Sequence, residues 1–320
     1  MNPAPAVLVW AQWLSDHSLA VTLAMALVAL TIEGLWRVVA ANQTTQTVPP
    51  GTMNRWANTW FTNAALLACA MALSWLLSPW LSPLFSDALS GHTGILAWLG
   101  AEQSSSAIHV ILGILLLDLM SYSLHRVMHA VPIFWRVHQV HHSDTEMNAS
   151  THFRQHPLQL LAAIAMQLPL VWLLGIPGVS WVLYTVLSAV VQLWHHSTLP
   201  LPVRVDRWLS LVVVTPQFHR VHHHPERRFH DANYGSVFPL WDRVLGTIVS
   251  PSLDRAVGLR DRRPAKSGST LSFTACLAMP FRTMRTTLAN RPAAAVAKAS
   301  VIGRKLKTRQ KLQPNNRGTT

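Results

Sequence analysis

Long apolar stretches recur along the chain as far as Trp194. Five of them run over 18–40, 64–83, 107–124, 158–176 and 179–194. Each is long enough to cross all or most of a bilayer, which takes about 20 residues. The last two are separated only by Pro177 and its neighbours, so we expect a tight hairpin that either spans the bilayer or re-enters from one side. The pattern predicts an all-α integral membrane protein with about four to five transmembrane or re-entrant helices.

The basic residues between the apolar stretches predict which way the helices face. Residues 1–17 and 84–106 contain no Lys or Arg, whereas 125–157 holds three arginines and the chain after 195 is rich in arginine. Basic loops stay on the cytoplasmic side of a membrane. We therefore expect the N-terminus outside and a cytoplasmic helical cap built from 125–157 and the C-terminal part.

The charge of the chain is concentrated at its end. Of all residues 12% are charged, against roughly 25% in a typical soluble domain. Acids and bases balance up to residue 261, so the net charge of +13 belongs to 262–320. That tail has only Phe273 and Phe281 as stacking aromatics, which argues against nucleic acid as a partner. We expect it to meet anionic lipid headgroups, with 271–288 lying in the interface as an amphipathic segment.

The candidate chemistry lies in the histidines, which number 17 against 13 acidic residues. Eight of them fall in three clusters: His125 and His129; His138, His141 and His142; and His219, His222 and His223. Spacings of three or four residues place side chains on one helix face, about 5–6 Å apart. Consecutive histidines point about 100° apart on a helix. Each HH pair could therefore serve two different metal ions.

The order of the apolar stretches can bring the three clusters together. The first cluster continues from the third apolar stretch, and the hairpin over 158–194 returns the chain to the same face of the membrane. Eight imidazoles are too many for one tetrahedral zinc ion, which takes four ligands. An all-nitrogen site suits Zn, Fe, Cu or Ni. Cys69 and Cys276 lack CxxC spacing and add no thiolate site, so we expect two ions with five or six imidazole-rich ligands each.

Further motifs surround these clusters and form one series. They are Asp118-x-x-x-Tyr122-x-x-His125-Arg126-x-x-His129, Trp135-Arg136-x-His138-x-x-His141-His142-Ser143-Asp144, Arg154-x-His156-Pro157, His195-His196-Ser197, Thr215-Pro216-x-x-His219-Arg220-x-His222-His223, Asn233-Tyr234-Gly235 and Trp241-Asp242-Arg243-x-x-Gly246-Thr247. With this series the chain resembles the fatty acid hydroxylase/sterol desaturase superfamily of membrane-bound, histidine-rich di-iron oxygenases. It departs from the family at Thr198, where many relatives have Asn, and at His224, where they often have Ser.

The resemblance implies a set of metal ligands. They are His125, His129, His138, His141, His142, His196, His219, His222 and His223. His195 is the less favoured member of its pair, and His156 is a further ligand or a group that supports one. Asp118, about two helical turns before His125, is expected to orient a ligand imidazole or else to pair with a neighbouring span. Asn233 opens an expected turn and is, like His156, a further candidate for a ligand or a group that supports one. Trp241-Asp242-Arg243 is expected to shape the cap.

The resemblance also implies the activity, which is O₂-dependent hydroxylation or desaturation of a C–H bond in a fatty acyl, sterol or related lipid by two iron ions. The chain shows no Rossmann glycine fingerprint, cysteine cluster or haem-attachment motif. Electrons must then come from a separate redox partner, either ferredoxin-like or a small haem carrier with its reductase. We expect a bacterial inner (plasma) membrane protein with membrane helices over 1–106, a catalytic domain over 107–250 and a basic tail over 251–320.

Two other functions remain open at this point. A membrane acyl-lipid desaturase uses a similar three-box plan, although HRxxH, Asn-Tyr-Gly and Trp-Asp-Arg favour the hydroxylase/sterol desaturase branch. A metal transporter or another metal-binding membrane protein would also use histidines. A transporter is expected to place its polar ligands near the middle of the membrane, whereas these clusters fall at the ends of apolar stretches.

Overall fold

The computed structural model describes residues 18–43, 52–89, 94–98, 107–250, 256–259 and 271–282, and within these ranges it contains helices and no strand. The helices are α2 (Ser18–Gln43), α3 (Thr52–Ala88), α4 (Ile95–Trp98), α5 (Ala107–Ala130), α6 (Pro132–His142), η2 (Ala149–Phe153), α7 (Pro157–Leu174), α8 (Gly178–His196), α9 (Val203–Leu209), α10 (Pro216–His222), α11 (Arg227–His230), α12 (Leu240–Val244), α13 (Phe273–Ala278) and η3 (Met279–Phe281). The chain divides into two compact units, 1–280 and 281–320. The predicted all-α class is confirmed.

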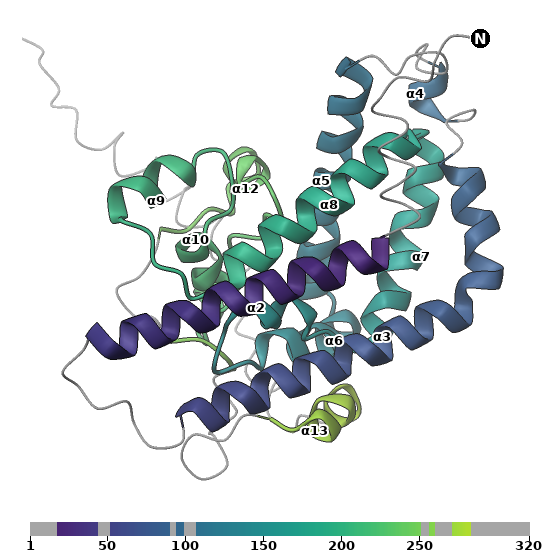
Figure 1. The fold of residues 1–320 in the computed structure, drawn as a ribbon. Helices are drawn as coiled ribbons and strands as arrows, with labels where there is room; N and C mark the ends of the chain where they lie inside the picture. Colours follow the sequence, from purple (N-terminus) through teal and green to yellow (C-terminus); the bar gives the residue numbers. More distant parts are fainter. Residues whose placement is uncertain are drawn as a thin grey trace, which may run out of the picture. The chain divides into compact units, whose positions relative to one another are not determined.

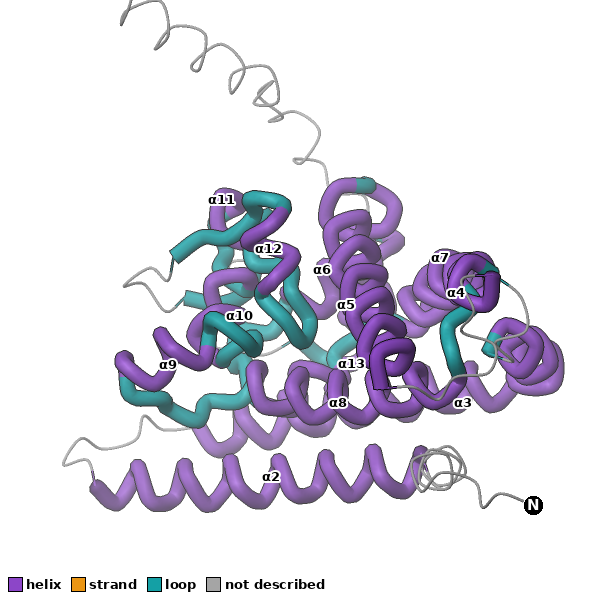
Figure 2. The backbone as a smooth tube through the Cα atoms, turned by 90° about the horizontal axis from the view of Figure 1, so that it is seen from above, coloured by secondary structure: helices purple, strands orange, loops and turns teal. Residues whose placement is uncertain are grey.

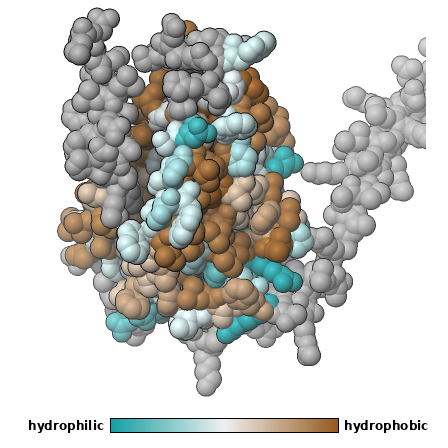
Figure 3. Space-filling view, turned by 90° about the vertical axis from the view of Figure 1, so that its right-hand side faces the viewer, coloured by the Kyte–Doolittle hydropathy of each residue, from teal (hydrophilic) through white to brown (hydrophobic). Residues whose placement is uncertain are grey.

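Four helices are long and apolar enough to cross a membrane: Asn54–Ala88, Ala107–Ala130, Pro157–Leu174 and Gly178–His196. They cover four of the five predicted stretches, and α2 covers the remaining one. Large apolar side chains stand on their outer faces, with Trp75 78% exposed and Ile108 74% exposed. Figure 3 shows hydrophobic side chains over much of one face of the molecule. Exposed apolar surface on this scale marks a site of association, and the helices fit an integral membrane protein.

α3 is longer than one membrane crossing requires. Its 37 residues would extend about 55 Å as a straight helix at 1.5 Å per residue, against a hydrocarbon core of about 30 Å. Pro79 and Pro83 lie inside the helix, where each removes a backbone hydrogen bond and favours a kink. Figure 1 shows α3 changing direction along its length.

The helices of the unit 1–280 pack around α5 and α8. α5 packs against α6, α7 and α8, while α3 packs against α7 and α13. Gly113 allows the close crossing of α5 and α8, because a Cβ there would lie 2.5 Å from Ser180 Oγ. Figures 1 and 2 place the short helices α9, α10 and α12 together, and α10 contacts α8. The short helices therefore meet one end of the long ones.

Two sharp turns set the direction of the long helices. Between α5 and α6 only Val131 intervenes, in an extended conformation before Pro132 at the first position of α6, as expected for a residue that precedes proline. Between α7 and α8, Gly175 adopts a positive φ of 67° and ends α7. Pro177 then precedes the first residue of α8. The predicted hairpin over 158–194 is thus two helices joined by a tight turn.

Candidate metal centre

The turn between α5 and α6 brings the first two histidine clusters together. His125 and His129 occupy the last turns of α5, and α6 carries the second cluster back past them. The Nε2 atoms of His125 and His138 lie 3.1 Å apart, and those of His129 and His142 are also 3.1 Å apart. The two clusters therefore point their ring nitrogens at one another.

α8 and α10 add the remaining rings. His196 is the last residue of α8, so the hairpin does return the chain to the first two clusters. The start of α10 is fixed by Pro216 in its first turn and by Thr215, whose side chain accepts from Phe218 N at 3.3 Å. His219 and His222 follow on this short helix.

The nine histidines form two groups whose candidate ligand atoms lie within 4.8 Å of one another in each group. The five-histidine group is His125, His129, His138, His142 and His222, and the four-histidine group is His141, His196, His219 and His223. The pairs His141-His142 and His222-His223 are each split between the two groups. The rings of His141 and His142 are inclined by 88°, which matches the expectation that neighbours on a helix serve different ions.

Backbone carbonyls fix the orientation of three of these rings through Nδ1. The acceptors are Tyr234 O for His125 (2.8 Å), Ala232 O for His222 (2.8 Å) and Gln192 O for His196 (2.7 Å). A carbonyl oxygen only accepts, so Nδ1 carries the proton and Nε2 keeps its lone pair. Metal-binding histidines are commonly held in this way. The Asn-Tyr-Gly motif thus acts at the site through its backbone.

The contacts among the ring nitrogens fit a metal ion better than hydrogen bonding. His219 Nε2 lies 3.0 Å from His196 Nε2 and 3.1 Å from His223 Nε2. One ring nitrogen carries either one proton or one lone pair, so it cannot satisfy both neighbours. Two nitrogens bound at right angles to one ion, with bonds of about 2.1 Å, lie about 3.0 Å apart. In addition, His222 Nε2 is buried and has no hydrogen-bond partner within the described part of the chain.

Burial keeps the rings outside the candidate spans neutral. It lowers the pKa of His138, His141, His142, His219, His222 and His223 well below the usual 6.5, and neighbouring histidines lower it further. A histidine must be deprotonated to bind a metal. The site therefore presents its imidazoles in the binding form at neutral pH.

The expectation that Asp118 orients a ligand imidazole is wrong. Its Oδ1 accepts from Tyr184 Oη at 3.0 Å and from Val237 N at 3.2 Å. Its Oδ2 accepts from Trp241 Nε1 at 2.9 Å and from Phe238 N at 3.3 Å. These donors use the acceptor sites of the carboxylate, so the buried acid ties α5 to α8 and to the segment before α12. The pairing with a neighbouring span, which the sequence left open, is what the structure contains.

The other candidates beside the centre lie outside both groups. His156 Nδ1 accepts from Leu158 N and caps α7, while its Nε2 lies 3.2 Å from Leu277 O. His195 is buried and stacks on His219 at 4.0 Å between ring centroids, and neither of its ring nitrogens has a hydrogen-bond partner among the residues that the structure describes. Asn233, at a positive φ of 55°, donates to Phe218 O and Val249 O and accepts from Val249 N. It supports α10 rather than the metal directly.

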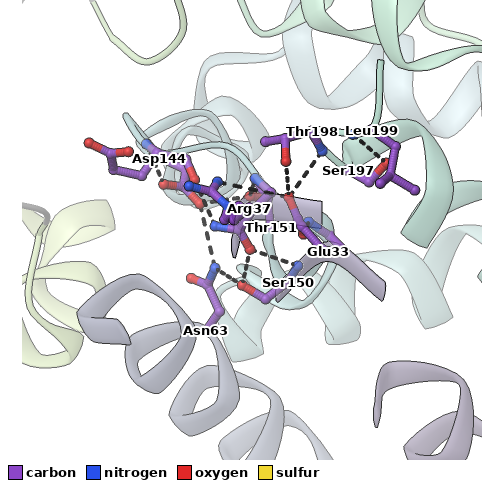
Figure 4. Close-up of polar contacts among 12 residues, drawn as sticks. Glu33, Arg37, Asn63, Asp144, Ser150, Thr151, Ser197, Thr198 and Leu199 are labelled. Atoms are coloured by element: carbon purple, nitrogen blue, oxygen red, sulfur yellow. Dashed lines mark hydrogen bonds and ion pairs between the residues drawn. The ribbon is translucent and has the colours of Figure 1, made fainter. Parts of the chain in front are cut away.

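A polar network next to the centre was not predicted from the sequence. Glu33 of α2 is fully buried. Its Oε1 accepts from Thr198 N (3.0 Å) and Thr198 Oγ1 (2.6 Å), and its Oε2 accepts from Ala149 N (2.8 Å). Figure 4 shows this carboxylate between η2 and the chain that follows α8. A single acid within a long apolar helix was the available signal.

A second part of this network surrounds a buried arginine. Arg154 donates to Val140 O, Ser143 Oγ and Asn63 Oδ1, and its Nη2 lies 3.3 Å from Cys276 Sγ. Cys276 comes from α13, where it is fully buried. α13 therefore packs on the protein through Cys276, and the interfacial position expected for 271–288 stays a prediction. The rest of that segment, from 283, lies outside the described residues.

Comparison with known proteins follows the same motifs. Residues 110–247 match the fatty acid hydroxylase family. Human alkylglycerol monooxygenase is 34% identical over 142 residues, which are 44% of this chain and 31% of the human protein. Ornithine lipid hydroxylase OlsE of Rhizobium tropici is 28% identical over 247 residues, 77% of this chain and 70% of that protein. Mouse lathosterol oxidase is 27% identical over 185 residues, 57% and 59% of the two chains.

The match with the alkylglycerol monooxygenases is partial, because the chain spans about a third of their length (31% and 30%). No solved structure matches the chain. The family match contains all nine histidines of the two groups. The comparisons thus show that residues 110–247 resemble the fatty acid hydroxylase family.

Proposed function

We propose that this protein is a membrane-bound di-iron enzyme that uses O₂ to oxidise a C–H bond of a lipid. The observation that carries the proposal is the convergence of nine imidazoles into two groups at the ends of candidate membrane helices. The relatives support it, because their names describe a monooxygenase, a hydroxylase and an oxidase of lipids. An alkylglycerol, an ornithine lipid and a sterol are therefore all candidate substrate types.

The two histidine groups divide the proposed ligands between two ions. The five-histidine group would hold one iron and the four-histidine group the other. When bound, the pair would supply the electron-transfer chemistry that activates O₂. The carbonyls of Tyr234, Ala232 and Gln192 keep Nε2 of His125, His222 and His196 free for the metal.

The substrate would bind in a cavity of about 190 Å³ that is lined by histidines of both groups. Its apolar lining includes Leu124 and Met128 of α5, which favour a lipid over water. In hydroxylation, a C–H bond becomes C–O–H with one oxygen atom of O₂. The other atom leaves as water, with two electrons from a separate redox protein and two protons.

We also propose that the histidine groups face the cytoplasm. Arg126, Arg136 and Arg154 lie in the segment 125–157, and the chain after 195 is rich in arginine, as the positive-inside rule requires of a cytoplasmic face. A reduced ferredoxin-like or haem-containing partner would be found on that side. A transporter is less well supported, because the named relatives are enzymes.

Ligand variants test the proposal. We expect His222→Ala and His219→Ala to lower bound iron, measured by inductively coupled plasma mass spectrometry, and to abolish lipid-dependent O₂ consumption. His109→Gln is the matched control, since it lies on α5 sixteen residues before His125, about 24 Å along the axis, and should keep its iron. Full iron in either ligand variant, or iron accumulation inside vesicles without O₂ use, would overturn the proposal.

Lipid profiling of cells with and without the protein distinguishes the two reactions. A product heavier by one oxygen atom indicates hydroxylation. A product lighter by two hydrogen atoms indicates desaturation and would support the acyl-lipid or sterol desaturase alternative.

A further inference from the structure

The lining of the cavity beside the histidines is unexpectedly polar. Besides histidines, four amides and two hydroxyls line it: Gln155, Gln159, Gln167, Gln192, Ser121 and Ser236. None of the described residues that line it carries a carboxylate, ammonium or guanidinium group. The cavity is thus lined by hydrogen-bonding groups, and none of the described side chains that line it carries a fixed charge.

Part of this lining is a stripe on α7. Gln159, Ala163 and Gln167 are spaced by four residues and therefore share one face of the helix, and all three line the cavity. α7 is a candidate membrane span with a mean hydropathy of 1.8. Gln167 lies eight residues beyond Gln159, about 12 Å along the axis. An amide at this depth in an apolar helix is unfavourable unless it finds a hydrogen-bond partner.

The glutamines differ in what they contact. Gln159 Oε1 lies 3.2 Å from His138 Nδ1, and its Nε2 donates to Gln155 Oε1 at 3.3 Å. The Gln192 side chain hydrogen-bonds His152. For Gln167 there is no hydrogen bond to another described residue. Its amide therefore remains available to a molecule in the cavity.

We propose that the cavity binds the end of a lipid that carries a neutral hydrogen-bonding group, either a hydroxyl, an ether, an ester or an amide, and that Gln167 contacts that group. A bare hydrocarbon segment would leave the amide unpaired, and a charged headgroup would find no opposite charge in the lining. Sites built to hydrogen-bond a substrate reject analogues that lack the partner.

This inference rests on the proposed lipid oxidation, because it assigns the substrate class of the same cavity. Its test is equilibrium binding without turnover. The full chain in nanodiscs, without reductant, is offered three probes with the same 18-carbon chain: the octadecyl monoether of glycerol, octadecanoate and octadecane. We expect the monoether to bind about tenfold more tightly than octadecane, a difference of about 1.4 kcal/mol.

Gln167→Leu should remove that preference while leaving bound iron unchanged. Leu161→Met is the matched control, because Leu161 lies on the same helix, 37% exposed and outside the cavity lining, and it should bind the probes as the wild type does. Equal binding of all three probes by the wild type, or an unchanged preference in Gln167→Leu, would refute the inference.

These failures leave the proposed function intact if iron is bound and O₂ is consumed. Conversely, a protein that binds no iron contradicts the proposed function, while the binding preference still tests the cavity.

Discussion

Replacing Glu33 by alanine tests whether the N-terminal helix supports the metal centre. The carboxylate is fully buried and accepts from two backbone N–H groups, those of Ala149 and Thr198, and from the Thr198 hydroxyl. Thr198 follows His196 by two residues, and Ala149 begins η2 after the second histidine cluster. The variant therefore releases two segments next to the four-histidine group, one that begins at Ala149 and one that follows His196.

The expected loss of stability follows from the unpaired donors. Leaving one buried donor unpaired costs ~1–3 kcal/mol, so the two N–H groups together account for about 2–6 kcal/mol. Glu33→Gln keeps one acceptor oxygen and should lose about half of this amount. Ion pairing contributes little, since Arg37 lies 3.9 Å from Glu33 and is partly exposed.

The assay combines thermal unfolding in detergent with iron analysis of the purified protein. We expect the Tm to fall by several degrees in Glu33→Ala and by less in Glu33→Gln, and iron to be lost from the four-histidine group first. Leu35→Ala, at a position 62% exposed on the same helix, should behave as the wild type. If Glu33→Ala melts with the wild type and retains its iron, α2 does not support the centre.

Four further changes have definite expected outcomes. Ending the chain after residue 282 should keep iron and Tm, whereas ending it at 262 removes the α13 contact to Arg154 and should lower both; equal melting of the two truncations contradicts this. Gly113→Leu overfills the α5–α8 crossing and should cost about 1–3 kcal/mol, measured by denaturant or thermal unfolding. Asn233→Ala loses three hydrogen bonds and, unlike Asn233→Gly, keeps a β-carbon at positive φ, so iron content should fall more than in Asn233→Gly. Chelation of the metal should lower the Tm, because a ligand that binds only the folded state stabilises it, and added ferrous iron should restore it.

Much of the metal centre could be predicted because its geometry is local. His125 and His129 are one helical turn apart, as are His138 and His142, and the proline and glycine turns that redirect the helices are also visible in the sequence. A spacing of three or four residues already fixes which side chains share a face. Spacing thus indicates eight of the nine histidines, whereas His196 is indicated only by the resemblance to the family.

The supporting contacts could not be predicted because they join distant parts of the chain. Glu33 meets Thr198 across 165 residues, and Asp118 meets Trp241 across 123. No periodicity relates such positions, so the local rule that an acid two turns below a histidine orients it gave the wrong partner for Asp118. Gln159 and Gln167 did carry a readable signal, because they are two amides eight residues apart on one face of an apolar helix.

The histidines alone therefore do not define the centre, since its supports come partly from outside the domain at 110–247 that matches the fatty acid hydroxylase family. Glu33 and Asn63 lie before the domain, and Cys276 lies after it. All three contact the segment between the second cluster and α7, and Glu33 also contacts the chain just after α8. Buried polar groups must be paired to be tolerated, so Arg154 and the N–H groups of η2 require these helices. A domain cut to residues 110–247 would keep all nine candidate ligands and lose these partners. We expect that fragment to bind little iron, whereas the chain from 18 to 282 binds it fully; iron bound equally by both would show that the histidines are sufficient.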